Sequence, residues 1–382
     1  MLGFFKYWDF IAANLSLIPG IDLPQLGIPL PIGISFYTFQ TMSYTIDVYR
    51  KDAPVQRNMV DFGAFVTMFP QLIAGPIVQY KTVAADLRHR LHTSENFALG
   101  ARRFCVGLAK KVLLANSIGA LWEDCLAAQG AGTLTVLGGW LGLAAYGFQI
   151  YFDFSGYSDM AIGLGRLFGF RFLENFNYPY ESRTVTEFWR RWHISLGSWF
   201  RDYVYIPLGG SRCSRSRWLL NVFLVWGLTG LWHGAAWNFV LWGLFFAVLL
   251  AAEKLWYGHG LEKTRLLKHL YMLPLLAVSF VLFHAADLPA AGQQIAALFG
   301  FGGLPASGVE SLYYLRSYAV VLVIALLGAT PLPAKAVQRL RDTSAGSAVL
   351  SVAEPVALVL LLAVCTAYLV DGSFNPFLYF RF

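Results

Sequence analysis

Apolar runs of about 20 residues recur along the whole chain, and they limit its possible folds more than any other feature. A run of that length can cross a membrane as one helix. Only 13% of the 382 residues are charged and 57% are hydrophobic, whereas charged residues make up about 25% of a typical soluble domain. This composition excludes an ordinary cytosolic enzyme, a disordered protein and a fibrous protein, and it predicts an all-α polytopic membrane protein. The expected spans lie near residues 30–48, 60–79, 98–118, 134–152, 217–233, 236–253, 269–286, 313–330 and 352–370.

Glycine and proline interrupt several of these runs, as at Pro70 and at Gly75-Pro76. Non-helical backbone at membrane depth is tolerated only where protein or a water-filled cavity covers it. Some of the segments are therefore expected to be re-entrant. No linker is long enough to separate soluble domains, so we expect a single membrane-embedded domain over residues 1–382.

The distribution of basic residues predicts a topology for the second half of the chain. The net charge is +7, and basic side chains gather at 212–217, 263–268 and 335–341, whereas the connection 287–312 has no lysine or arginine. Cytoplasmic loops carry such an excess, so we attribute the positive charge to membrane topology and expect no nucleic-acid partner. The first cluster is then followed by a helical hairpin with its turn at 232–234, and the C-terminus lies outside.

Familiar signatures of soluble enzymes are missing from the sequence. There is no serine-hydrolase elbow, zinc-protease motif or nucleotide-binding loop. The four cysteines include no C-x-x-C pair, so the sequence predicts neither a disulfide framework nor a metal site. Polar residues inside apolar runs are therefore the better candidates for function.

His233 is the sharpest of these candidates, in the apolar segment GLTGLWHGAAWNFVLWG at the expected hairpin turn. Counting from Arg217 at about 1.5 Å per residue places it roughly 24 Å from the cytoplasmic edge. A buried imidazole is biased to its neutral form, which can accept a proton at pH 7. The pattern fits a catalytic base and a capping or interfacial histidine beside Trp232 and Trp237 equally well.

His193 lies in a cationic and aromatic segment, EFWRRWHISLGSWFRDYVYIPLGG. Tryptophans such as Trp189 favour the headgroup level, and arginines such as Arg190 and Arg191 bind phosphate or lipid headgroups there. Simple anchoring explains this pattern. The sharper interpretation is a site at the cytoplasmic mouth for an acyl donor that bears phosphate.

Asp153, Ser155 and Asp159 place polar groups inside another apolar run. Intramembrane carboxylates either pair with arginine or line a wet cavity. We favour pairing, a structural role, and keep Asp153 as a weaker candidate for substrate binding.

Two of these segments, FWRRWHISL (188–196) and LWHGAAWNF (231–239), together resemble the membrane-bound O-acyltransferases. The similarity is strongest to the bacterial alginate O-acetyltransferase branch, which YIPLGGSR (205–212) favours over the related teichoic acid branch. Other matching segments cover nearly the whole chain, at 30–50, 69–80, 151–180, 227–243 and 375–382.

The resemblance implies a helical disc with a central tunnel and about nine to eleven membrane helices, re-entrant segments included. The family's essential histidine falls on His233 and its second characteristic histidine on His193. The implied reaction moves an acyl group, preferably acetyl, from a cytoplasmic co-substrate such as acetyl-CoA to hydroxyls of an extracytoplasmic polysaccharide such as alginate. Transfer is direct or passes through an SGNH-type partner enzyme. The expected location is the bacterial inner membrane, with no bound cofactor and no metal.

Two departures from the family pattern are visible in the sequence. Relatives usually carry further membrane helices before the segment that corresponds to 4–10, and we expect these helices to be missing here. His284 stands where relatives often have an arginine.

Two other classes of protein fit parts of the pattern. A transporter or flippase for an envelope glycan or lipid would explain broken helices and intramembrane carboxylates, although no second copy of either histidine motif suggests repeated halves. An inactive subunit that lacks the N-terminal helices is the other alternative.

The topology predicts which sites an impermeant thiol reagent reaches from outside the cell. In a background without the native cysteines, a cysteine at Gly372 should be labelled and one at Ser214 should not, because basic connections stay inside. The reverse labelling pattern would overturn the topology.

Overall fold

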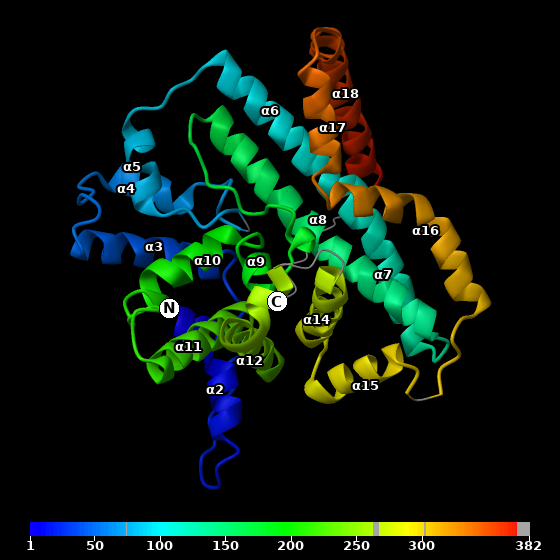
Figure 1. Ribbon diagram of the computed structural model, residues 1–382. Helices are drawn as coiled ribbons and strands as arrows, with labels where there is room; N and C mark the ends of the chain where they lie inside the picture. Colours follow the sequence, from blue (N-terminus) through cyan, green and yellow to red (C-terminus); the bar gives the residue numbers. More distant parts are fainter. Residues whose placement is uncertain (74, 263–266, 302, 373–382) are drawn as a thin grey trace.

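The computed structural model describes residues 1–73, 75–262, 267–301 and 303–372, and these residues form helices and connections without a strand (Figure 1). The predicted all-α fold is confirmed. The helices in chain order are α1 (Leu2–Phe5), α2 (Trp8–Leu15), α3 (Ile34–Tyr49), α4 (Met59–Thr67), α5 (Tyr80–Arg88), α6 (Ser94–Ala109), α7 (Asn116–Gly130), α8 (Val136–Leu167), α9 (Val185–Trp189), α10 (Ile194–Phe200), α11 (Arg215–His233), α12 (Trp237–Ala252), α13 (Gly258–Glu262), α14 (Leu267–His284), α15 (Leu288–Leu298), α16 (Val309–Gly328), α17 (Leu332–Arg341) and α18 (Ser344–Asp371), with π-helical turns η1 (Lys110–Ala115), η3 (Arg201–Tyr205) and η4 (Glu253–Tyr257) and the 3-10 turn η2 (Pro179–Glu181).

Four helical stretches of the described residues are long and apolar enough to cross a membrane: Ser94–Gly130, Trp237–Tyr257, Val309–Gly328 and Ser344–Asp371. They contain or closely match the spans expected at 98–118, 236–253, 313–330 and 352–370. In the last of them, α18, only 6% of the most apolar stretch is buried within the protein. Such a helix is suited to face lipid.

The expected span at 60–79 is wrong as a continuous helix. Helix α4 ends at Thr67, and the chain then turns through Pro70, which has no backbone N–H to donate. Residues 75–80 are all buried, and the Gln71 side chain donates to the carbonyl of Phe65 at 3.0 Å. Protein therefore covers this non-helical backbone, as the glycine and proline breaks predicted.

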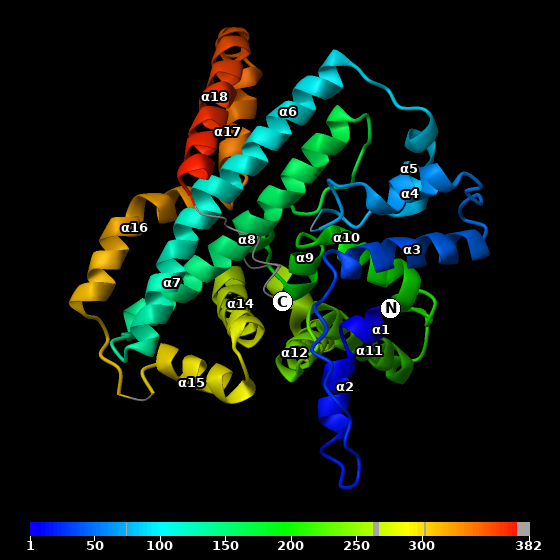
Figure 2. The same cartoon turned by 180° about the vertical axis from the view of Figure 1, so that it is seen from behind.

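Helices α6 and α8 run antiparallel and pack along one another in the body of the protein (Figures 1 and 2). Glycines allow them to approach at two levels. A Cβ on Gly107 would lie 2.6 Å from the carbonyl oxygen of Gly156, and one on Gly100 would lie 2.7 Å from that of Gly163. Small residues permit such contact between membrane helices, where dispersion and polar contacts drive association.

Ion pairs fasten the same interface. Asp159 binds Arg103 and Lys110, each at 2.7 Å, and Asp153 binds Lys111. The interpretation of these aspartates as partners of basic residues is therefore confirmed, although one partner is arginine and two are lysines.

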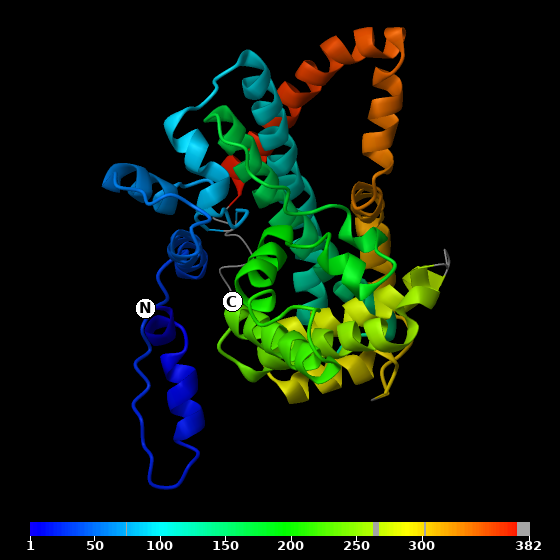
Figure 3. The ribbon, with the colours of Figure 1, turned by 60° about the vertical axis from the view of Figure 1, so that its left-hand side comes forward.

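The part of the protein that carries the candidate site contains an aromatic core between α8 and the α11–α12 hairpin. The short helices α9 and α10 pack into this core. Figure 3 shows this part beside α14, with α2 and residues 16–33 projecting away from the body. Helix α11 ends at His233, within the turn expected at 232–234, and α12 begins at Trp237. The basic cluster at 263–268 lies mostly, and the motif at 375–382 entirely, outside the described residues.

The glycine contacts predict a stability effect. Gly107→Ala should destabilise the protein by about 1–3 kcal/mol, because the added methyl group must displace the backbone of α8. Gly227→Ala in α11 is the matched control, since a Cβ there meets nothing within 4 Å. Thermal unfolding in detergent should show a lower midpoint for the first variant only, and an unchanged midpoint would contradict the close α6–α8 contact.

Candidate active site

His233 is the last residue of α11 and lies where the hairpin turn was predicted. Its side chain is buried among aromatic rings, with centroids 4.9 Å from Trp232, 5.0 Å from Trp242 and 5.3 Å from Phe283. This environment shields the imidazole from bulk water.

The N-terminal segment holds the end of α11 in place. Lys6 donates to the backbone carbonyls of Trp232 at 2.5 Å and His233 at 3.3 Å, and Tyr7 donates to that of Leu231 at 2.8 Å. The last carbonyls of a helix lack intrahelical partners and carry the negative end of its dipole, so a lysine is a favourable cap. Sequence reasoning missed this role, although a lone lysine within FFKYW is a signal for it.

His193 adopts the left-handed backbone conformation, with φ of 45°. Few residues other than glycine do so, and such a conformation persists where the surroundings fix it. Here two segments of chain pair on either side: Ile194 N–H donates to the carbonyl of Asn175 at 3.0 Å, and Asn177 N–H donates to that of Arg191 at 2.9 Å. His193 is thereby fixed against the segment that precedes α9.

The His193 side chain enters a buried polar cluster. Its Nδ1 lies 3.1 Å from Oδ1 of Asn175, which also accepts from the hydroxyl of Ser195 at 2.9 Å. The ring packs edge to face on Phe154 at 4.7 Å and lies 6.1 Å from Trp232, the neighbour of His233. The indole of Trp232 therefore adjoins both histidines.

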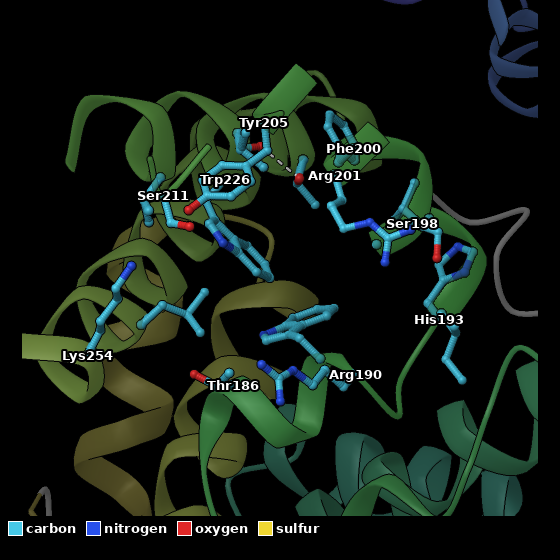
Figure 4. A pocket seen from close by; sticks show the side chains of 18 of the residues that line it. Thr186, Arg190, His193, Ser198, Phe200, Arg201, Tyr205, Ser211, Trp226 and Lys254 are labelled. Atoms are coloured by element: carbon cyan, nitrogen blue, oxygen red, sulfur yellow. Dashed lines mark hydrogen bonds between the residues drawn. The ribbon is translucent and has the colours of Figure 1, made fainter. Parts of the chain in front are cut away.

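A cavity of about 640 Å³, here called the His193 cavity, opens beside this cluster. Trp226, labelled in Figure 4, and Trp189 form part of an apolar wall. Thr229 also lines the cavity, one turn before His233 on α11. The remaining lining residues are Thr186, Arg190, His193, Ile194, Leu196, Gly197, Ser198, Phe200, Arg201, Tyr205, Ser211, Trp218, Val222, Val225, Leu250 and Lys254. The lining residues from α11 extend as far as Thr229, and His233 itself is not among them.

Three cations surround the hollow in Figure 4, where Lys254 lies across from His193. Arg201 is held by Asp202 at 2.7 Å, and this hydrogen bond raises the pKa of the Arg201 guanidinium above its usual value. Within the part of the chain that the structure describes, Arg190 and Lys254 have no carboxylate partner, and Lys254 lies over the ring of Trp218 at 4.2 Å. Arg201 and Lys254 belong to π-helical turns, which frequently occur at functional sites.

A second cavity, here called the charged cavity, adjoins the first and shares Thr186, Arg190 and Lys254 with it. Its volume is about 1180 Å³, and Lys335 of α17 lines it. Arg190, from the cationic segment expected at the cytoplasmic mouth, and Lys335, from the basic cluster at 335–341, thus line one pair of cavities.

The candidate donor-binding residues divide within this arrangement. Trp189 and Arg190 line the His193 cavity, whereas Arg191 binds Glu187 at 2.7 Å and the carbonyl of Asn177 at 3.1 Å at the edge of the charged cavity. Asp153 on α8 pairs with Lys111 of η1, the turn that follows α6, and lines neither cavity. The described residues contain no cluster of three or more His, Cys, Asp or Glu that could hold a metal.

Comparison with known proteins identifies the family. The membrane-bound O-acyltransferase (MBOAT) family matches residues 34–285, a range that includes both histidines. A probable alginate O-acetylase, AlgI, of Azotobacter vinelandii is 43% identical over 100% of this chain and 82% of its own length. A peptidoglycan O-acetyltransferase of Helicobacter pylori is 35% identical over 80% of this chain and 63% of its own, and a teichoic acid D-alanyltransferase of Bacillus subtilis is 30% identical over 64% and 63%. The chain therefore belongs to the membrane-bound O-acyltransferase family and is a multi-pass membrane acyltransferase.

Proposed function

We propose that this acyltransferase moves an acetyl group from a cytoplasmic donor such as acetyl-CoA to hydroxyls of an extracytoplasmic polysaccharide such as alginate. The donor enters through the charged cavity and places its thioester in the His193 cavity. The acceptor, either the polysaccharide itself or an SGNH-type partner enzyme that carries the acyl group onward, approaches His233 from the other side. The proposed location is the bacterial inner membrane.

One arrangement carries this proposal: an apolar cavity with cations around it, His193 in its wall, and Thr229 leading to His233. A thioester donor needs a dry slot for the acyl group and positive charge for its phosphates, and the two joined cavities offer both. The relatives named for alginate and peptidoglycan acetylation support a polysaccharide acceptor.

The proposed chemistry uses the neutral imidazole of His233, one helical turn beyond Thr229 of the cavity wall. His233 takes the proton of the acceptor hydroxyl as that oxygen bonds to the thioester carbonyl carbon. The tetrahedral intermediate then expels the carrier thiolate, which receives the proton from His233. General base catalysis of this kind contributes typically 10²–10⁴-fold in rate.

The function is tested by measuring the O-acetyl content of secreted polysaccharide with and without the gene. Loss of O-acetyl groups on deletion, restored by the intact chain, supports the proposal. Unchanged O-acetylation together with altered export of a glycan or lipid would favour a transporter, and failure of the chain to restore O-acetylation would favour an inactive subunit.

His233→Ala should lower acyl transfer by about 100- to 10,000-fold, because the base is lost. Membrane insertion should be unchanged, since the helix cap from Lys6 uses backbone carbonyls. His89→Ala, at an exposed histidine after α5, is the control and should retain activity. Wild-type O-acetylation by His233→Ala at equal expression would exclude this residue as the base.

Arg190→Gln should raise the apparent KM for the donor by roughly 10- to 150-fold, since a charge-assisted contact to phosphate contributes about 1.5–3 kcal/mol. Arg171→Gln, at an exposed arginine that lines neither cavity, is the matched control and should leave the donor KM unchanged. Initial rates at varied donor concentration, with folded protein quantified, give both values. An unchanged donor KM in Arg190→Gln would leave only membrane anchoring for this residue.

A further inference from the structure

A buried hydrogen-bond network behind the His193 cavity determines which nitrogen of His193 carries the proton. Asn175 is fully buried, and its Oδ1 accepts from the backbone N–H of Ser195 at 3.2 Å as well as from the Ser195 hydroxyl. Its Nδ2 donates to the hydroxyl of Ser158 at 3.0 Å. The Ser195 hydroxyl in turn accepts from the backbone N–H of Ile77 at 3.0 Å, so its own proton is directed at Asn175.

These partners fix the orientation of the Asn175 amide. A backbone N–H can only donate, so the atom that receives it from Ser195 must be the amide oxygen. The same oxygen lies 3.1 Å from Nδ1 of His193, and an oxygen acceptor requires an N–H there. The neutral imidazole is therefore protonated at Nδ1, and Nε2 carries the lone pair.

Nε2 of His193 is a buried acceptor without a partner among the described residues. His193 is 2% exposed, so bulk water does not satisfy this atom, and buried polar atoms in folded proteins generally have a partner. The residue lines the His193 cavity, where a ligand can supply the missing donor group.

We propose that Asn175 is a positioning residue that holds His193 in the Nδ1–H form, so that Nε2 accepts a hydrogen bond from an O–H or N–H group of a substrate bound in the His193 cavity. In this form the neutral His193 cannot donate a hydrogen bond to the oxyanion of the acyl-transfer intermediate. The proposal deepens the function of the cavity and rests on the proposed acyl transfer there. Two substrate groups have the required chemistry, an amide N–H on the arm of the acyl donor and the attacking hydroxyl of the acceptor.

The protonation form can be read without any activity measurement, by ¹⁵N NMR of histidine-labelled protein in lipid. The His193 signals are assigned from their loss in His193→Asn, whose shorter amide can still donate to Asn175 and whose residue type tolerates the left-handed backbone. We expect Nδ1–H in the wild type and a loss of this preference in Asn175→Leu. Ser158→Ala, which removes a partner of Asn175 on the side away from His193, should keep Nδ1–H. An Nε2–H form in the wild type would overturn the proposal even if Asn175→Leu does not fold.

Kinetics then test what Nε2 does. His193→Asn keeps the donor to Asn175, but its shorter side chain has no acceptor at the position of Nε2, and we expect at least a 10-fold loss of kcat/KM. An effect mainly on donor KM identifies the donor arm, and an effect mainly on kcat identifies the attacking hydroxyl. Asn175→Leu should lower kcat/KM by about 10- to 100-fold, the range found when the hydrogen-bond partner of a metal-binding histidine is removed. Wild-type kinetics in His193→Asn would overturn the role of Nε2. That result together with full loss in His233→Ala would leave the proposed function standing.

Discussion

The constraint on which this structure depends is that a polar group buried in an apolar protein must find its partner inside the protein. The left-handed backbone at His193 exists because residues 175–177 pair with residues 191–194 on both sides of it. The end of α11 is formed in the same way, since its last carbonyls are satisfied by Lys6 and Tyr7 from the other end of the sequence. Both histidines are thus positioned by hydrogen bonds of backbone groups, because these buried groups must find their partners within the protein and not in water.

The scaffold and the site use polar residues differently. Between α6 and α8, aspartates and basic residues neutralise one another, and glycines bring the helices together. Around the His193 cavity, Arg190 and Lys254 have no such counterpart within the described structure. Positive charge left uncompensated beside an apolar wall attracts an anionic ligand with an apolar end, which describes an acyl thioester with phosphates.

Neighbouring residues of one motif therefore have different roles. Arg190 and Arg191 are adjacent in FWRRWHISL and directly follow the end of α9 at Trp189, yet their side chains have different surroundings. Arg191 connects Glu187 to the carbonyl of Asn177 and so stabilises the paired segments that fix His193. Arg190 faces both cavities.

The sequence alone determined the class of fold, because apolar length and low charge leave a helical membrane protein as the one solution. It also determined the hairpin turn at His233, the breaks at Pro70 and Gly75, and the family, because these depend on local residue types and on motifs. Only the tertiary structure decided that Lys6 caps α11, that Asp153 belongs to a helix interface, and that Asn175 adjoins His193. Those contacts join residues far apart in the chain, and a pattern along one segment carries no information about which distant segment will satisfy its buried polar groups.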